Sequence, residues 1–476
     1  MISTTVGDIA AAVGVPIPPS GADAVVTGVE FDTRKLRPGS LFVALVGERV
    51  DGHDFGPAAA LAGAVAVLGS RPLPPGSPPL LRLPGNDEVL RALSVIASQS
   101  VTQLLERGLT VIGVTGSAGK TSTKDLIAAV LRAGFGQERV VAPPESFNNE
   151  LGHPYTVLRA DEDTRFLVLE LSARGPGHIA ALAATAPPRI GAVLNVGTAH
   201  LGEFGSVAGI AQAKGELVEA LPTADQGGVA ILNADDPLVR SMADRTTAAV
   251  VTVGTCADAI VRAEKIGMDV AARARFTLVT PEGSAPVQLA VVGAHQVSNA
   301  LGAAAVGRAV GMPVTAVAAA LSGATAASKW RMEITERADG VTVINDSYNA
   351  NPESMKAALQ ALAVIGEHRH TWAVLGEMAE LGESARPAHD EIGRLVVRLG
   401  IDRLIVVGQA ARALHLGAHL EGSWGGESEI VPDVAAALAV LERDVRAGDV
   451  VLVKASRSVG LDRVAAALLT RPGVRT

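Results

Sequence analysis

The sequence predicts an α/β protein of three domains, and three observations support this prediction. The chain has 476 residues, about three times the length of a typical domain. Apolar residues make up 48% of it but aromatic residues only 3%, so Ala, Val and Leu must form the cores, as in sheets covered by helices. Short β-branched runs alternate with helical stretches along much of the chain. We expect domains at residues 1–85, 86–326 and 327–476.

The first segment is expected to form a small α/β domain. Thr5, ahead of an alanine-rich run, predicts a short helix, and strand-like runs follow at 25–31 and 41–45. Pro and Gly are frequent at 72–85, which indicates a surface connection. A helix at 88–107 then leads into the second domain.

The second segment alternates strands and helices, which predicts a parallel sheet with crossover helices. Its predicted strands lie at 166–171, 190–195, 228–233 and 249–253. Residues 257–292 predict an antiparallel appendage with a turn at 281–283, and two alanine-rich helices flank Pro313.

The third segment predicts a second doubly wound fold, without the GxGxxG fingerprint of a dinucleotide site. Its predicted strands lie at 341–345, 371–375, 404–407 and 450–453. Its predicted helices begin at about Pro352, lie near His389 and span 433–445.

Composition narrows the partners and the compartment. A net charge of −8 argues against nucleic acid or an anionic membrane and favours a small-molecule substrate. The single cysteine, Cys256, excludes an intrachain disulfide and a cysteine-based zinc site, which favours the cytoplasm. The longest apolar stretch, 58–68, is far shorter than the roughly 20 residues of a membrane-spanning helix, so we expect no membrane insertion.

The strongest motif is GVTGSAGKTS at 113–122, a strand that enters a Gly-rich turn and then a helix. Its glycines let backbone N–H groups surround phosphate oxygens, Lys120 can reach the outer phosphates, and the hydroxyls after it can hold Mg²⁺. A turn without a ligand is the alternative. The expected nucleotide-binding residues are Thr115, Gly116, Ser117, Ala118, Gly119, Lys120, Thr121 and Ser122.

Two further residues follow strands that should end at the same edge of this sheet. Glu170 ends one strand and His200 follows another by a short loop, so both are candidate Mg²⁺ ligands near the phosphate loop. Each residue type is also common in solvated loops. An NKxD guanine reader is absent, which disfavours a GTPase, while a motor, a kinase and an ATP-driven ligase remain possible. The third α/β domain favours a ligase that joins two substrates.

Several motifs, in this order, resemble the Mur ligases of peptidoglycan synthesis. They are TGSAGKTS (115–122), NVGTAHLGEFGS (195–206), AKGEL (213–217), GAHQVSNAL (293–301), RMEI (331–334) and NDSYNANPESM (345–355). SFNNELGHP at 146–154 and the N-terminal DTRKLRPGSLFVAL most resemble the branch of the family that adds D-alanyl-D-alanine to UDP-N-acetylmuramoyl-tripeptide. The resemblance implies an ATP-dependent ligase whose three domains bind the UDP end, ATP and the dipeptide, respectively.

The resemblance also implies roles for single residues. Lys120, His200, Lys214 and Arg331 would be catalytic, and Asn299, Arg331 and Asp346 would lie near the nucleotide. Thr121, Glu170, His200 and a carbamylated Lys214 would hold Mg²⁺. The expected substrate contacts are Asp32, Thr33, Arg34, Asn148, Asn149, Tyr348, Asn349 and Asn351.

Other interpretations remain open. Ordinary turn chemistry explains the polar residues at 32–34 equally well. Another Mur-type ligase, a folylpolyglutamate-type ligase and a P-loop ATPase switch without ligase activity are the alternative functions. We expect a monomer.

Overall fold

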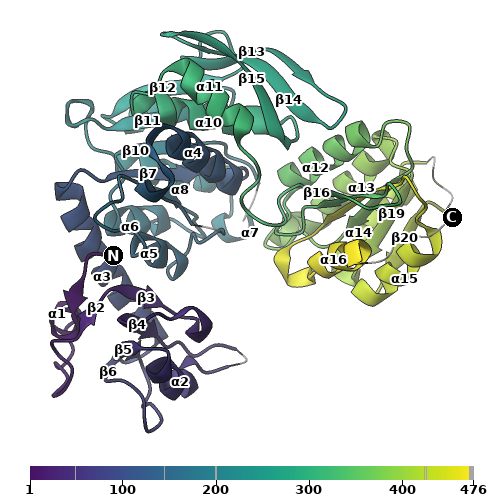
Figure 1. The fold of residues 1–476 in the computed structure, drawn as a ribbon. Coiled ribbons are helices and arrows are strands. Elements are labelled where there is room, and N and C mark those ends of the chain that lie inside the picture. Colours follow the sequence, from purple (N-terminus) through teal and green to yellow (C-terminus); the bar gives the residue numbers. More distant parts are fainter. Residues whose placement is uncertain (49, 144, 199–200, 423, 425, 471–476) are drawn as a thin grey trace.

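The structure is a computed structural model that describes residues 1–48, 50–143, 145–198, 201–422, 424 and 426–470. Figure 1 shows three bodies in chain order, an N-terminal body in purple, a central body in blue to green and a C-terminal body in green to yellow. Each is built around its own sheet with helices packed on it. The predicted α/β class is confirmed.

The N-terminal body carries a parallel sheet of order β3-β4-β5-β6 and a short antiparallel pair, β1 and β2. These strands are β1 (Thr4–Thr5), β2 (Val25–Val26), β3 (Gly28–Glu30), β4 (Ser40–Val43), β5 (Ala64–Gly69) and β6 (Leu80–Arg82). Its helices are α1 (Val6–Ala12) and α2 (Gly56–Leu61). The helix expected at Thr5 forms because a capping box with Asp8 satisfies its first backbone N–H groups. Helix α3 (Asn86–Glu106) then runs to the central body, within two residues of its predicted bounds.

The central sheet has the order β15-β14-β13-β12-β11-β10-β7-β9-β8. Its strands are β7 (Thr110–Thr115), β8 (Val140–Val141), β9 (Phe166–Glu170), β10 (Ile190–Val193), β11 (Val229–Asn233), β12 (Ala249–Gly254), β13 (Val261–Met268), β14 (Arg273–Thr280) and β15 (Gly283–Val292). The antiparallel strands were expected to form an appendage, but β13 pairs in parallel with β12 and so extends the main sheet. The exposed edge of β12 explains this, because its backbone groups need partners.

Helices cover both faces of the central sheet, which accounts for the nearly continuous apolar strands. They are α4 (Lys120–Phe135), α5 (Gly152–Val157), α6 (His178–Thr185), α7 (Leu201–Phe204), α8 (Val207–Glu219), α9 (Pro237–Arg240), α10 (Gln296–Ala309) and α11 (Val314–Gly323). Neighbouring residues of β7 point to opposite faces. Val111 packs in the core that includes Leu217 of α8, whereas Ile112 packs in the core that includes Leu126 of α4.

The C-terminal sheet has the order β16-β17-β21-β18-β19-β20, with β16 as an antiparallel edge. Its strands are β16 (Glu333–Glu336), β17 (Thr342–Asn345), β18 (Thr371–Leu375), β19 (Arg403–Val407), β20 (Ser428–Val431) and β21 (Val450–Lys454). Its helices are α12 (Pro352–Ile365), α13 (Ala385–Arg398), α14 (Arg412–Leu420), α15 (Val434–Asp444) and α16 (Asp462–Thr470). The strands predicted for this segment are all present.

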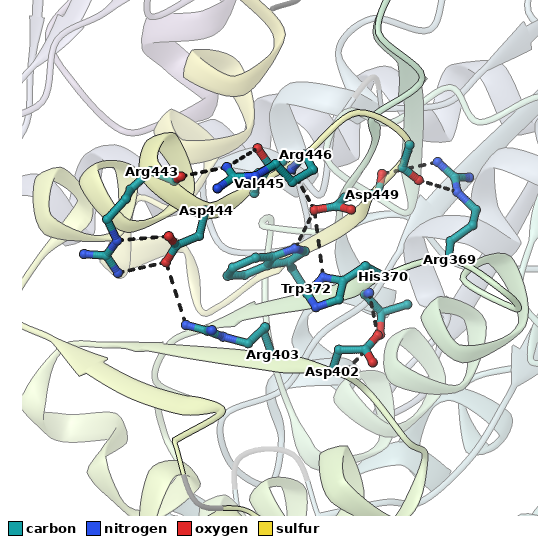
Figure 2. A network of polar contacts seen from close by, with 12 residues as sticks. Arg369, His370, Trp372, Asp402, Arg403, Arg443, Asp444, Val445, Arg446 and Asp449 are labelled. Carbon is teal, nitrogen blue, oxygen red and sulfur yellow. Dashed lines mark hydrogen bonds and ion pairs between the residues drawn. The ribbon is translucent and has the colours of Figure 1, made fainter.

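A polar network joins the amino ends of the C-terminal strands (Figure 2). Asp449 lies at its centre and accepts hydrogen bonds from the indole N–H of Trp372 and the backbone N–H of Arg446, both at 2.9 Å. Arg403 stacks over the Trp372 ring. Since ligand sites of parallel sheets lie at the carboxyl ends of the strands, this network stabilises the fold.

Across the described residues, we find no helix with the length and apolar character needed to cross a membrane.

Candidate active site

The phosphate loop joins β7 to α4, as predicted. Gly119 has a φ of +83°, and a Cβ at this position would lie 2.4 Å from Oδ1 of Asn299, so both conformation and space require glycine. Lys120 Nζ donates to the Gly116 carbonyl at 2.8 Å. The Asn195 side chain accepts from Ala118 N at 2.9 Å and donates to Ala118 O at 3.0 Å, which holds the loop in place.

Glu170 is the carboxylate on which the neighbouring side chains converge. It is buried at the end of β9 and accepts hydrogen bonds from Thr121 Oγ1 at 3.0 Å, Ser146 Oγ at 2.7 Å and Asn148 Nδ2 at 2.7 Å. Two predicted Mg²⁺ ligands, Thr121 and Glu170, therefore lie together with Asn148, which was predicted as a substrate contact. These oxygen groups are of the kind that Mg²⁺ prefers.

Two lysines of the central body have depressed pKa values. Burial lowers the pKa of Lys120, an effect that the Glu170 carboxylate opposes and the Arg331 charge reinforces. Lys214 is buried on α8, and this burial, together with the charge of Lys120, holds its pKa well below the ordinary value. Lys214 therefore lies inside the protein, close enough to Lys120 for the two charges to interact.

Arg331 reaches the phosphate loop from the start of the C-terminal body. Its Nη2 donates to Thr121 Oγ1 at 3.1 Å, and its guanidinium lies 4.3 Å from the ring centroid of Tyr348. A cation is thereby placed at the first turn of α4, where phosphate oxygens bind in such loops.

The C-terminal body also contacts the loops beside the phosphate loop. Asn351 caps α12 and donates from Nδ2 to the Ser117 carbonyl at 3.3 Å. Glu353 Oε1 accepts from the backbone N–H and the hydroxyl of Thr198, at 2.9 and 3.0 Å. The central and C-terminal bodies therefore meet at the nucleotide loop.

Between these two bodies lies a cleft of about 400 Å³. Its central-body wall consists of residues 117–122, 146, 148–150, 170, 172, 174 and 178. Its C-terminal wall consists of residues 331, 348–351, 354, 379, 380 and 456–458. Most of the predicted nucleotide and dipeptide residues line this cleft.

Some predicted residues lie in other surroundings. Asp346 is buried, pairs with Lys454 Nζ at 2.6 Å and accepts from Met332 N at 3.1 Å, so it anchors the chain beside Arg331. Asn299 accepts from the Thr123 hydroxyl at 3.1 Å and donates to the Gln296 side chain at 2.9 Å. Asn299 thus lies against the loop at Gly119, and its contact with the nucleotide stays a prediction.

Four other predicted residues form hydrogen bonds within their own loops. Arg34 forms two hydrogen bonds with Asp32, at 2.8 and 2.9 Å, and this pairing lowers the pKa of Asp32 to about 2. Asn149 and Asn349 accept from backbone N–H groups of their own loops. His200 lies outside the described residues.

The sequence interpretation did not single out Ser146, Asn195 or Glu353. Asn195 ends a predicted strand beside the phosphate loop, so its position could have indicated a role. Glu353 lies in the motif at 345–355, but an acidic residue in the first turn of a helix is also explained by the helix dipole.

Family models match three stretches of the chain. The Mur ligase middle domain matches residues 114–307, the Mur ligase glutamate ligase domain matches 330–457, and a Mur ligase family catalytic domain matches 25–84. A UDP-N-acetylmuramoyl-tripeptide–D-alanyl-D-alanine ligase of Mycobacterium leprae is 51% identical over all of both chains. The chain belongs to the Mur ligase family.

Other Mur ligases agree in sequence and in structure. The enzyme of the same name from Escherichia coli is 36% identical over 94% of this chain and 95% of its own. A crystal structure of MurF from Acinetobacter baumannii superposes with a TM-score of 0.82, 28% identity, and coverage of 98% of this chain and 99% of that one. A MurF ligase from Thermotoga maritima, solved in complex with ADP, gives a TM-score of 0.75 and 27% identity, covering 93% and 96%.

The donors at this Mur ligase cleft suit a cation that is bound jointly with phosphate. Among the described residues, no group of three or more His, Cys, Asp or Glu side chains forms a metal cage. Mg²⁺ characteristically takes one or two carboxylates and completes its shell with phosphate and water oxygens. Glu170 and Thr121 fit that pattern.

Proposed function

We propose that the chain is an ATP-dependent ligase that joins D-alanyl-D-alanine to UDP-N-acetylmuramoyl-tripeptide in peptidoglycan precursor synthesis. The observation that carries the proposal is the cleft between a phosphate loop and a C-terminal wall, in a chain 51% identical to a ligase of that name. Two substrates can meet there over one nucleotide. The single cysteine and the use of ATP favour a cytoplasmic enzyme, and we propose that it acts there as a monomer.

Each body takes one part of the reaction in this proposal. Residues 1–85 bind the UDP end, with Asp32, Thr33 and Arg34 as candidate contacts. Residues 86–326 bind ATP, and residues 327–476 bind the dipeptide. Tyr348, Asn349 and Asn351 are candidate dipeptide contacts because they line the C-terminal wall of the cleft.

The chemistry must first activate a carboxylate, which by itself resists nucleophiles. A carboxylate oxygen of the tripeptide attacks the γ-phosphorus of ATP and ADP leaves, which gives an acyl phosphate. The dipeptide amine then attacks the acyl carbon, loses a proton and expels phosphate. Lys120 and Arg331, on opposite walls, offset the negative charge that develops on the transferring group.

The proposed Mg²⁺ site comprises Thr121, Glu170, His200 and Lys214 as a carbamate. The cation, when bound, neutralises charge on the phosphate oxygens. A neutral amine is the form that reacts with CO₂, and the burial that depresses the pKa of Lys214 favours that form. Carbamylation turns an amine, which Mg²⁺ does not bind, into an oxygen ligand.

Lys214 variants test the carbamate. Lys214→Ala is expected to be nearly inactive, and acetate should restore part of its activity by filling the vacated space. Lys214→Arg should stay inactive, because a guanidinium keeps its charge. High activity of the arginine variant would remove the carbamate from the proposal.

Phosphate release tests the proposed reaction. The protein is incubated with ATP and UDP-N-acetylmuramoyl-tripeptide, and with D-alanyl-D-alanine, a single amino acid or no acceptor. We expect phosphate release only when D-alanyl-D-alanine is the acceptor, together with a product that has the mass of the UDP-linked pentapeptide. Equal release without an acceptor would indicate an ATPase switch, and release with a single amino acid would indicate another ligase of this type.

A further inference from the structure

Two charged residues directly after the phosphate loop have no part in the reaction described above. Lys124 is fully buried, and its Nζ donates to the Pro143 carbonyl at 2.7 Å and to Ser328 Oγ at 3.2 Å. Asp125 pairs with Lys124 at 2.6 Å and accepts from the backbone N–H of Ser328 at 3.1 Å. Both side chains therefore hold one point of the segment that leads into the C-terminal body.

The chain just beyond Ser328 adopts an unfavourable backbone conformation. Trp330 has a φ of +58° and Met332 a φ of +50°, so the two residues that flank Arg331 are both left-handed. Bulky side chains rarely adopt this conformation, because Cβ approaches the following carbonyl. Such a conformation persists only where the surrounding contacts impose it.

The contacts on the C-terminal side are equally specific. Met332 N donates to Asp346, which is itself paired with Lys454. The Trp330 carbonyl accepts from Tyr348 N at 3.3 Å. The segment is thus held by α4 at Ser328 and by the C-terminal body at Trp330 and Met332.

The position of Arg331 follows from these two attachments. Its Nη2 reaches Thr121 Oγ1, and Thr121 precedes Asp125 by four residues, one turn on the same face of α4. Helix α4 therefore binds the segment at Ser328 through Asp125 and also contacts Arg331 through Thr121. A second cavity of about 260 Å³, lined by Asp125, Arg331 and Met332 among others, leaves space into which a released segment could shift.

We infer that Lys124, Asp125 and Ser328 form a clasp that positions Arg331 against the phosphate loop. They are positioning residues, since they act through Arg331 and do not line the phosphate end of the cleft themselves. The inference rests on the proposed ligase function. Under this inference, the segment from Ser328 to Met332, and not only the C-terminal body, determines whether Arg331 reaches the transferring phosphate.

A double-mutant cycle tests the clasp. Asp125→Asn keeps the shape of the side chain and removes its charge, and we expect kcat to fall about ten-fold while KM for UDP-N-acetylmuramoyl-tripeptide stays within about two-fold. In an Arg331→Ala background, the same change should cost no further activity, because the residue that it positions is gone. Equal ten-fold losses in both backgrounds would overturn the inference.

Two further variants guard against general destabilisation. Ser328→Ala removes the hydroxyl from the other side of the clasp and should show the same dependence on Arg331. Asp402→Asn is the matched control, because Asp402 also accepts a backbone N–H, from Thr371 at 2.8 Å, within the C-terminal body. We expect Asp402→Asn to leave kcat unchanged, and a loss equal to that of Asp125→Asn would overturn the inference.

Failure of the wild-type protein to ligate would instead overturn the proposed function.

Discussion

The junction between the N-terminal and central bodies differs from the junction between the central and C-terminal bodies in what fills it. At the first, Phe31, Phe147 and Tyr155 form edge-to-face aromatic pairs, and Tyr155 donates to the buried Glu30 at 2.9 Å. One hydrophobic cluster continues from Leu41 of β4 into Leu169 of β9. This junction has the composition of a protein interior.

The second junction combines polar contacts at the active site with a hydrophobic cluster that joins Ala272 and Val292 to Met332. Its contacts include Arg331 with Thr121 and Glu353 with Thr198, and two glycines meet directly at its edge. A Cβ on Gly382 would lie 2.8 Å from the Cα of Gly202, so the backbones touch there. Breaking a polar contact costs little net free energy because water takes the place of the partner. Separating apolar surfaces costs more, because it exposes them to water. The active site therefore lies at the junction with direct polar contacts to the phosphate loop, and the junction that resembles a protein interior lies away from it.

The largest effect is expected at the polar junction where it reaches the phosphate loop. Arg331→Ala should lower kcat by about 10²-fold or more, because a charge that stabilises the transferring phosphoryl group is lost. The midpoint of thermal unfolding should change little, since Arg331 contributes no apolar core. Steady-state phosphate release and calorimetry measure the two quantities. A large loss of stability with a small loss of activity would mean that this junction is structural.

A smaller effect is expected one contact away. Glu353→Ala should lower kcat about ten-fold, because Thr198 loses both of its hydrogen bonds to α12 and its loop keeps only the bonds of Val196 and Gly197. Glu353→Gln keeps one acceptor oxygen and should lie between this variant and the wild type. Unchanged kcat in both variants would show that the contact between Glu353 of α12 and Thr198 does not affect catalysis.

The apolar junction should respond in stability and not in rate. Tyr155→Phe keeps the ring and removes the donor to buried Glu30, so we expect the free energy of unfolding to fall by about 1–3 kcal/mol. We expect kcat to stay within about two-fold of the wild type, because the junction remains filled. Urea unfolding and kinetics provide the measurements, and a ten-fold loss of kcat without a loss of stability would contradict the comparison.

The same tyrosine predicts a small effect at high pH. Burial and the Glu30 hydrogen bond raise the pKa of Tyr155 to about 12, above the value of about 10 for an exposed tyrosine. Its contribution to stability is therefore complete below pH 10 and is lost as pH rises toward 12. The difference in unfolding free energy between wild type and Tyr155→Phe should shrink over this interval. A constant difference would show that the hydroxyl does not titrate with folding.

The α/β class, the phosphate loop and most strands of the two larger sheets could be predicted from the sequence, whereas β8, β16 and β20 were missed. The predicted features depend on periodicity or on a few adjacent residues, such as the eight from Thr115 to Ser122, so they are visible without a fold. Short-range chemistry also placed the caps, as at Thr5. The resemblance to a family then supplied roles that local patterns cannot carry.

The surroundings of each charged residue are visible only in the folded protein. The fold places Lys214 in the interior near Lys120, and it brings Asp125 to Ser328, which lies 203 residues further along the chain. The fold also pairs Asp346 with Lys454 beside the segment that carries Arg331. Such contacts arise when separate sheets pack together, and burial then changes the pKa of a lysine in ways that no local pattern records. The chemistry of the cleft is therefore a property of how the bodies meet.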